Sequence, residues 1–583
     1  MKKYKKIVHL APLDEIRFKV LYIFGLLIIF CLFGRLVKLQ VFNASDLQRE
    51  ARSLQSFKIN PFKKRRSIVD RNNRLIAYDK PLYKLWAHPK YFNFIGDSRN
   101  RVRSIEEVAK KLSPILDMRY EILMEKFHNK IGGIMLLDKI SEERAEKIKN
   151  LQISGLDLFK YSQRYYPQGE LYSNLVGFVN DENKGSAGLE LYLDNQIKVF
   201  KKSNFIKRGG DGTPLPDNSA PGDFISDYKS LGLTIDSKLQ KASFKALSRQ
   251  VSKWKAKKGF AIVMDVNNGQ ILSLVTAPTY DPNKFWLYDS ELYKGWHSQD
   301  IFEPGSTFKP INLALALEEK VIQKDGLVED IGKINVGGWT LSNWDKKGNG
   351  YIDYPKLLQV SSNVAMVKIM QNIDPAIYWD LLKNLGINES LETDIYESTA
   401  GQLKKKDLFV KQSIEPAVAS FGKGFSISPL KLVQLHAALA NGGFEVTPHV
   451  TTNFKEREYE NSKKQFFSNE VSKTVLEWME SVVDKGSGSR AKIEDYRIAG
   501  KTGTSLKALN GSYTSKKVCS FVATLPVNDP KYVVLVVVDE PSKSHAYGST
   551  VAVPVAKEII ESLIVIEKIP PNIKDHEIIV KKP

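Results

Sequence analysis

Residues 304–320 read PGSTFKPINLALALEEK, and this stretch decides how the C-terminal half of the chain is interpreted. Its apolar residues recur at helical spacing after Pro304-Gly305, which predicts a helix over 306–320. Ser306 and Lys309 are three residues apart, so the helix brings the lysine amine beside the serine hydroxyl. The stretch therefore predicts a nucleophilic serine at a helix start, with Lys309 as its general base if burial or neighbouring charge keeps the amine neutral.

The Ser-x-x-Lys spacing alone decides nothing, because it recurs in this chain at Ser226, Ser252, Ser420, Ser428 and Ser489. Two further motifs follow Ser306 in order and make the difference. They are Ser361-Ser362-Asn363 and Lys501-Thr502-Gly503-Thr504.

Each of these motifs fits one task in acyl transfer. The Ser361 hydroxyl can relay a proton from Lys309 to a leaving amine, and the Asn363 amide can fix a peptide backbone. Lys501 would polarise that relay and attract a substrate carboxylate. The Thr502 and Thr504 hydroxyls can bind the carboxylate, and Gly503 lets a substrate approach the strand.

The ordered trio resembles the penicillin-binding proteins and the class A β-lactamases. Further blocks resemble the class B penicillin-binding proteins: 65–77 (RRSIVDRNNRLIA), 164–169 (RYYPQG), 175–180 (LVGFVN), 185–190 (GSAGLE), 233–240 (LTIDSKLQ), 419–443 and 547–554. Within the first block, Arg66 and Asn73 stand where the family has Gly. Asn tolerates left-handed backbone well and Arg poorly, so the backbone at Arg66 is expected to differ from the family's.

The resemblance implies a peptidoglycan D,D-transpeptidase that acts through an acyl-enzyme on Ser306 and needs no cofactor or metal. Its partners would be stem peptides ending in D-Ala-D-Ala, and β-lactams that mimic them. The resemblance also implies an oxyanion hole made by the backbone N–H groups of Ser306 and Thr504.

Two related classes can be set aside. The sequence has no Glu-Asp-x-x-Phe block of a bifunctional class A enzyme and, between Asn363 and Lys501, no convincing deacylating Glu of a β-lactamase. Ser361-Ser362-Asn363-Val364 resembles the division-type (FtsI-like) proteins, so septal cross-linking beside an FtsW-like membrane glycosyltransferase and other division proteins is expected. An elongation-type transpeptidase and a catalytically idle penicillin sensor or scaffold are the alternatives.

Two apolar runs, 260–265 and 270–275, flank Asn267-Asn268-Gly269 and predict a β-hairpin. Helical spacing covers 306–320 and 429–440, and strands are predicted near 497–502, 518–525 and 531–539. Strands at both ends with helices between them indicate an α+β fold, an antiparallel sheet covered by helices.

Residues 20–34 (VLYIFGLLIIFCLFG) form an apolar run between Lys19 and Arg35, which predicts a membrane helix extended by the apolar residues up to 41. A cleaved signal peptide is the alternative. The lysines and arginines before the run put the N-terminus in the cytoplasm, so a single-pass protein of the inner membrane with its bulk in the periplasm is expected.

The 583 residues are too many for one core. The expected organisation is a cytoplasmic tail over 1–19, a transmembrane anchor over 20–41, a non-catalytic, elongated pedestal of the dimerisation type over 42–227, a transpeptidase domain over 228–567 and a C-terminal tail over 568–583. The net charge of +20 would also suit nucleic acid, but its lysines are spread along the chain without a nucleic-acid-binding motif, so none is expected as a partner. Cys31 and Cys519 predict no disulfide.

Overall fold

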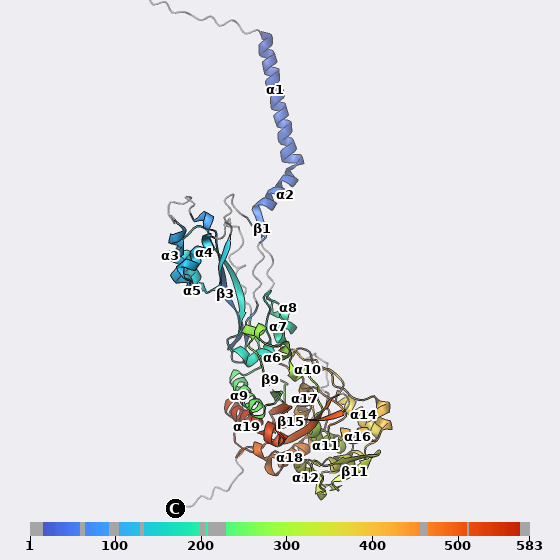
Figure 1. Ribbon diagram of the computed structural model, residues 1–583. Helices are drawn as coiled ribbons and strands as arrows, with labels where there is room; N and C mark the ends of the chain where they lie inside the picture. The colour runs from blue at the N-terminus through green and yellow to red at the C-terminus, as the bar shows by residue number, and fades with distance from the viewer. Residues whose placement is uncertain are drawn as a thin grey trace, which may run out of the picture. The chain divides into compact units, whose positions relative to one another are not determined.

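The computed structural model describes residues 15–58, 65–92, 104–128, 133–198, 205–207, 229–454, 464–509 and 512–571 (Figure 1). The chain divides into two compact units, 1–63 with 200–227, and 64–199 with 228–583. In the first unit, α1 (Glu15–Val37), a π-helical turn (Lys38–Phe42) and α2 (Ala44–Gln55) lead to β1 (Ser56–Lys58), which pairs antiparallel with β6 (Phe205–Lys207). The Gly/Pro-rich passage 209–222, interpreted from the sequence as a loop, lies outside the described residues.

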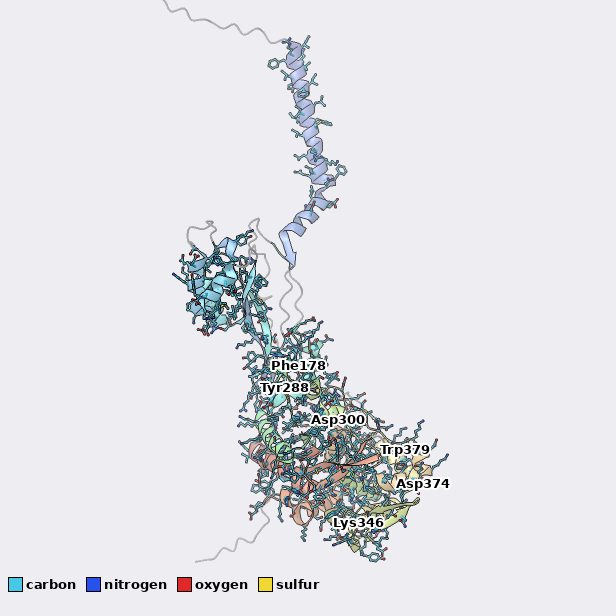
Figure 2. The ribbon with its side chains drawn as sticks, in the orientation of Figure 1. Phe178, Tyr288, Asp300, Lys346, Asp374 and Trp379 are labelled. Atoms are coloured by element: carbon cyan, nitrogen blue, oxygen red, sulfur yellow. The ribbon has the colours of Figure 1, made fainter. Side chains whose placement is uncertain are left out.

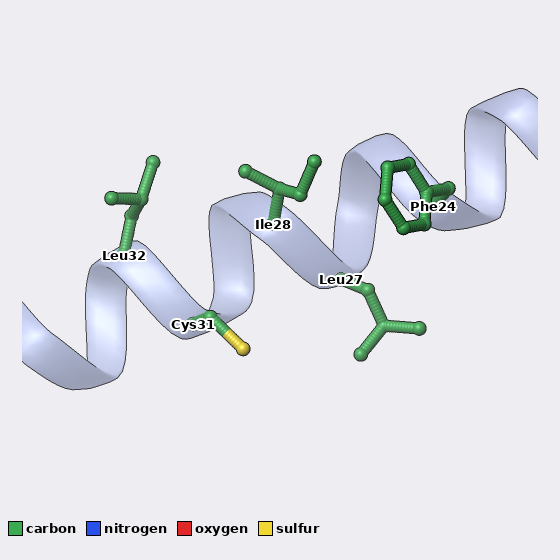
Figure 3. Close-up of a pocket in the computed structure, with 5 residues that line it drawn as sticks. All are labelled: Phe24, Leu27, Ile28, Cys31 and Leu32. Atoms are coloured by element: carbon green, nitrogen blue, oxygen red, sulfur yellow. The ribbon is translucent and has the colours of Figure 1, made fainter.

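The N-terminal helix is long and apolar enough to cross a membrane. The apolar helical stretch Ile16–Phe42 has 27 residues, which at 1.5 Å per residue is about 40 Å and exceeds the roughly 30 Å of a bilayer core. Figure 3 shows that Phe24, Ile28 and Leu32 lie along one side of α1, with Leu27 and Cys31 on the adjoining side. Among the described residues this is the one helix that is long and apolar enough to cross a membrane, and a signal sequence would meet the same criteria of length and composition.

The pedestal module, residues 65–198, is a sheet with helices packed on one end. Its strands are β2 (Ile68–Val69), β3 (Leu75–Ala87), β4 (Ile134–Ile140) and β5 (Leu156–Tyr165), and β3 pairs with the other three. Its helices are α3 (Ile105–Leu116), α4 (Tyr120–His128), α5 (Glu142–Asn150), α6 (Ser173–Val176), α7 (Gly188–Tyr192) and α8 (Asp194–Ile197). Apolar residues of α3, α4 and α5 pack on inward-facing residues of β3 and β4, such as Leu85 and Leu136, and form a separate small core.

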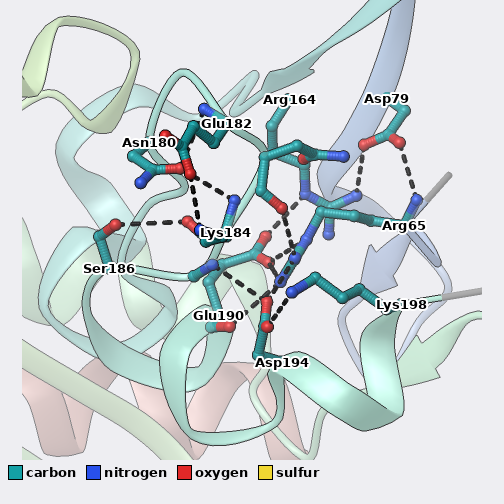
Figure 4. Close-up of polar contacts among 12 residues, drawn as sticks. Arg65, Asp79, Arg164, Asn180, Glu182, Lys184, Ser186, Glu190, Asp194 and Lys198 are labelled. Atoms are coloured by element: carbon teal, nitrogen blue, oxygen red, sulfur yellow. Dashed lines mark hydrogen bonds and ion pairs between the residues drawn. The ribbon is translucent and has the colours of Figure 1, made fainter. Parts of the chain in front are cut away.

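Three of the sequence blocks meet in a buried ion-pair network within the pedestal (Figure 4). Glu190 is fully buried and accepts from Arg65 Nε at 2.8 Å and from Arg164 Nε at 2.7 Å. Asp79 pairs with Arg164 Nη1 at 3.0 Å, Asp194 pairs with Arg65 Nη1 at 2.6 Å, and Lys198 pairs with Asp194. Three cations therefore face three carboxylates. The balance matters because an unpaired charge in this position would cost several kcal/mol, on the order of 3–5.

The backbone of the first block is as the sequence indicates at Asn73. This residue has φ = 60°, the left-handed conformation that Asn tolerates. Asp70 closes the turn by accepting from Asn72 N and Arg74 N, both at 2.8 Å, so the turn hydrogen-bonds to itself.

The pedestal and the C-terminal domain (residues 229–571) are joined through a strand and an aromatic cluster. β7 (Leu231–Gly232) lies parallel to β2, so the start of the C-terminal domain completes the pedestal sheet. Phe178, labelled in Figure 2, stacks on Phe285 at a centroid distance of 4.2 Å and meets Tyr293 edge-on at 4.9 Å. These contacts place the segment that follows α6 against the C-terminal domain.

The C-terminal domain is an antiparallel five-stranded sheet between two layers of helices. The strand order is β14 (Ala499–Leu509), β15 (Ser512–Leu525), β16 (Tyr532–Asp539), β8 (Lys258–Asp265) and β9 (Ile271–Ala277). α9 (Ser237–Trp254) and α19 (Gly548–Glu567) cover one face, and α17 (Pro429–Ala440) and α18 (Asn469–Lys485) lie on the other. This confirms the α+β fold that the sequence predicts.

Both faces of the sheet are buried, and the central strand shows why. In β16 (YVVLVVVD), Val534, Val536 and Val538 pack under α9 and α19. The alternate residues Val533, Leu535 and Val537 belong to the core on the opposite face. A strand without polar alternation is what a sheet covered on two sides requires.

The remaining elements, mostly helices with two small two-stranded sheets, form the rest of the domain beside the five-stranded sheet. They are α10 (Trp296–Gln299), α11 (Lys309–Glu318), β10 (Leu327–Asp330), β11 (Lys333–Val336), β12 (Trp339–Ser342), β13 (Gly350–Asp353), α12 (Tyr354–Val360), α13 (Asn363–Met370), α14 (Pro375–Asn384), α15 (Lys406–Lys411) and α16 (Ile414–Ala419).

Three predicted elements have different bounds in the structure. The α-helix predicted from Ser306 begins at Lys309, because Gly305–Phe308 forms a 3-10 turn and Pro310 lies in the first turn of α11, where proline is tolerated. The strands predicted to end at Thr502 and to start at Val518 extend to Leu509 and from Ser512, as one long hairpin.

Candidate active site

The three sequence motifs converge at one place. Ser306 lies in the 3-10 turn before α11, Ser361 ends α12, and Lys501 lies on β14. Ser306 is half-buried, whereas Lys309 is fully buried. Residues three apart eclipse each other in a 3-10 turn, so Ser306 and Lys309 still share one side although the α-helix starts later than predicted.

Ser361 is the residue that joins the motifs. Its hydroxyl lies 3.2 Å from Lys309 Nζ and 3.0 Å from Lys501 Nζ. Lys309 Nζ also donates to the Ser361 carbonyl at 2.6 Å and to Asn363 Oδ1 at 2.8 Å, and Lys501 Nζ donates to the Thr502 carbonyl at 2.9 Å. One hydroxyl therefore bridges two buried amines.

A left-handed backbone puts Ser361 in this position. The residue caps the C-terminus of α12 with φ = 57°, and the next residue, Ser362, starts α13 by accepting from Ala365 N. The sharp change of direction between the two helices turns the Ser361 side chain away from both and toward the lysines.

Burial shifts the titration of both amines. Burial first, and then the charge of Lys501, hold the pKa of Lys309 well below its ordinary value, while Asp330 acts in the opposite direction. Burial lowers the pKa of Lys501 to about 7. Two amines that share one hydroxyl in a dry site disfavour double protonation, so a state with one neutral and one charged lysine is accessible near neutral pH.

The side chains of the Lys-Thr-Gly-Thr motif alternate between the two faces of β14, so Thr502 and Thr504 share one face. Thr502 Oγ1 lies 2.6 Å from Ser487 Oγ, and Thr504 Oγ1 accepts from Gly548 N at 2.9 Å. A Cβ on Gly503 would lie 2.3 Å from Ser520 Oγ and 3.1 Å from Thr307 Cγ2. The glycine thus lets the strand pack closely against the turn that carries Ser306.

Three residues that support the site, Asn343, Asp330 and His436, are not indicated by any sequence motif. Asn343 Oδ1 accepts from Asn363 N, Val364 N and Ser362 Oγ, and Asp330 holds the Asn343 amide at 2.8 Å, so this pair fixes the start of α13. Burial lowers the pKa of His436 to about 4, and its neutral ring donates from Nε2 to the Thr307 carbonyl at 2.9 Å. No motif surrounds these residues in the sequence, because their partners lie 13 to 129 positions away.

Within the described part of the chain, no group of three or more His, Cys, Asp or Glu residues is arranged to hold a metal ion. The chemistry available at the site is that of the Ser361 hydroxyl between two amines, together with the half-buried Ser306 hydroxyl three residues before Lys309.

Comparison with known proteins agrees with this geometry. A family described as "Penicillin binding protein transpeptidase domain" matches residues 259–561, and "Penicillin-binding Protein dimerisation domain" matches residues 62–215. The chain is 38% identical to "Peptidoglycan D,D-transpeptidase FtsI homolog" of Mesostigma viride, over 93% of this chain and 94% of the relative. It is 28% identical to "Peptidoglycan D,D-transpeptidase FtsI" of Escherichia coli, over 93% and 90%.

A solved structure, the peptidoglycan synthetase from Bifidobacterium adolescentis, has the same fold with a TM-score of 0.65 at 22% identity, over 90% of this chain and 98% of the other. The family matches cover both modules that flank the aromatic junction, and the relatives align along nearly the whole chain. The resemblance inferred from the three motifs is thereby confirmed. This protein is a class B penicillin-binding protein of the FtsI-like type.

Proposed function

We propose that this protein cross-links peptidoglycan stem peptides as a serine D,D-transpeptidase. The observation that carries the proposal is the position of Ser361 Oγ between Lys309 and Lys501. Relatives that carry the name D,D-transpeptidase support the reaction class.

In the first half of the reaction, neutral Lys309 takes the proton of Ser306 while the oxygen attacks the carbonyl of the penultimate D-alanine. The proton then passes through the Ser361 hydroxyl to the leaving amine, and terminal D-alanine departs. Charged Lys501 polarises Ser361 during this transfer. The N–H groups of Ser306 and Thr504 would bind the developing oxyanion, a contribution worth about 100- to 1000-fold in rate per donor.

In the second half, an amine of another stem peptide attacks the acyl-enzyme and gives its proton back along the same path. The product is a new amide, and Ser306 is regenerated. The Thr502 and Thr504 hydroxyls bind the substrate's terminal carboxylate, and Asn363 orients its backbone. Ser487, hydrogen-bonded to Thr502, supports that carboxylate site.

Acylation should depend on pH in a way that reports the two lysines. The mechanism needs Lys309 neutral and Lys501 charged, so the rate should fall as the pH rises through the Lys501 pKa of about 7. It should also fall at low pH, where Lys309 becomes protonated. We expect the second-order rate constant for acylation by benzylpenicillin to follow a bell-shaped profile with its alkaline limb near pH 7.

Lys431 provides a matched control, because burial lowers its pKa to about 8 and its amine bonds Gln434, away from the three motifs. The Lys431→Met variant should keep the profile of the wild type. A rate that climbs steadily across the neutral range would mean that neutral Lys501 is the active form, which contradicts the proposed role.

The proposed setting is septal wall synthesis at the inner membrane. The apolar helix α1 would anchor the chain with its N-terminus in the cytoplasm and the catalytic domain in the periplasm. Glycan polymerisation would come from an FtsW-like glycosyltransferase, contacted through α1 and the pedestal block 65–77, together with other division proteins.

Depletion of the protein tests this assignment to division. Cells that lack septal cross-linking should grow as filaments with unfinished septa, visible by phase-contrast microscopy and by fluorescent D-amino acid labelling. Rounded or swollen cells that continue to divide would instead identify the chain as an elongation-type transpeptidase.

A further inference from the structure

A half-buried lysine lies in a loop that packs against the nucleophile turn. Lys423 stands between Gly422 and Gly424 in the loop that follows α16. Gly305 N donates to the Gly422 carbonyl at 2.9 Å, and a Cβ on Gly422 would lie 2.1 Å from the Gly305 carbonyl oxygen. The loop thus packs backbone against backbone on the residue that precedes Ser306.

Lys423 has no carboxylate partner in the described part of the chain. Its amine lies 4.5 Å from the centroid of the Tyr513 ring. The nearby Glu303 is otherwise engaged, because it accepts from Gly424 N at 2.9 Å and from the Tyr513 hydroxyl at 3.2 Å. Burial lowers the pKa of Lys423 and Glu303 partly offsets this, so an added anion would favour the charged amine.

The contacts of successive residues along β14 show on which side of Ser306 the Lys423 amine lies. Lys501 faces Ser361, Gly503 packs on Thr307, and a Cβ on Gly305 would contact Ser505 at 3.4 Å. The Lys423 amine lies over the ring of Tyr513, and Tyr513 pairs with Ala508 further along the hairpin. Lys423 therefore lies beyond Ser306, on the side away from Lys501.

A donor peptide must extend in that direction. In the proposed reaction its terminal carboxylate lies at Thr502 and Thr504, one residue from the carbonyl that Ser306 attacks. The part of the peptide that stays on the enzyme as the acyl group therefore continues past Ser306 toward Tyr513, with the spacing of an extended chain.

We propose that Lys423, with its ammonium group seated on Tyr513, binds a carboxylate carried by the acyl part of the donor stem peptide. The proposal rests on the proposed function of the Ser306 site and adds a specificity residue to it. A half-buried lysine amine that has no carboxylate partner among the described residues, in a loop against the turn of Ser306, is suited to a charge-assisted hydrogen bond with such a carboxylate.

Three penicillins that differ in one group test the proposal. Benzylpenicillin is neutral at the α-carbon of its acyl side chain, α-carboxybenzylpenicillin is anionic there, and α-aminobenzylpenicillin is cationic. Second-order acylation rates are measured on the full-length protein in detergent for the wild type, Lys423→Gln, Lys423→Glu and the exposed control Lys531→Gln, whose lysine pairs only with Asp529.

Lys423→Gln should slow α-carboxybenzylpenicillin by about tenfold relative to benzylpenicillin, the size expected for one lost ion pair in a partly dry site. Lys423→Glu should lower the acylation rate with α-carboxybenzylpenicillin further. It should raise the rate with α-aminobenzylpenicillin relative to that with benzylpenicillin. Lys531→Gln should leave all ratios unchanged. In the wild type, added salt should lower the ratio of the acylation rate with α-carboxybenzylpenicillin to that with benzylpenicillin. This measurement does not depend on whether any variant folds.

Equal changes for all three penicillins would assign Lys423 to packing on Tyr513 and overturn the proposal, as would a salt-independent ratio. These outcomes differ from failure of the proposed function, in which benzylpenicillin would not acylate the wild type at Ser306.

Discussion

Replacing Ser306 with Ala abolishes covalent labelling of the protein by a fluorescent penicillin. Only an activated nucleophile opens the lactam ring, and in the proposed mechanism that nucleophile is Ser306, three residues before the Lys309 amine that bonds Ser361. Loss of a nucleophile removes the covalent route entirely, so we expect a decrease of at least about 1000-fold. The labelled band on a denaturing gel measures it directly.

Serines with the same local spacing are the controls. Ser252 and Ser489 are also followed three residues later by lysine, yet both are exposed and belong to no cluster of motifs. Ser252→Ala and Ser489→Ala should label as the wild type does. A labelled Ser306→Ala protein would contradict the acyl-enzyme assignment.

The same variant separates an enzyme from a sensor. Supplied with glycan strands from a partner polymerase, the wild type should form cross-linked stem peptides and Ser306→Ala should not, as read by mass spectrometry of digested product. Acylation of the wild type without any cross-links would identify a penicillin sensor or scaffold built on this domain.

Replacing Lys309 with Met reduces acylation nearly as far, by about 1000-fold or more, because the serine then has no base. Methionine keeps most of the buried volume, which avoids a cavity next to the nucleophile. The lost amine also releases Ser361 and Asn363, whose oxygens it bonds at 3.2 and 2.8 Å. Stopped-flow or gel-based acylation rates measure the effect.

Lys431→Met removes an equally buried amine elsewhere in the domain and should leave acylation intact. The comparison separates loss of a base from the general effect of deleting a buried lysine. Rapid acylation of Lys309→Met would assign proton removal to another group, and Lys501, bonded to the same Ser361 hydroxyl at 3.0 Å, would be the first to test.

Several features of this protein follow from local sequence patterns. The hairpin of β8 and β9 is predicted because Asn267-Asn268-Gly269 separates two apolar runs, and α17 has the bounds that its apolar spacing indicates. The apolar run near the N-terminus predicts α1, and the ordered motifs identify the family. These signals are short-range, so neighbouring residues carry them.

The extent of the β14–β15 hairpin is not visible in the sequence. Residues 503–509 and 512–517 are mostly small, polar or basic, and the two segments form strands because they pair with each other, as at Ala508 with Tyr513. Cross-strand pairing supplies hydrogen bonds that the residue pattern of either segment does not encode. The hairpin in turn carries Tyr513 to Glu303 and Lys423, more than 80 residues away in the sequence.

The sequence by itself determined the fold class and which residues are candidates for the site, since residue type and spacing are local properties. The tertiary structure alone decided that Ser361 Oγ bridges Lys309 and Lys501, that Asn343 fixes the start of α13, and that His436 and the loop of Lys423 lie against the nucleophile turn. The physical reason is desolvation. Only packing removes the two lysines from water and lowers their pKa values, and it is this environment that gives the sequence motifs their chemistry.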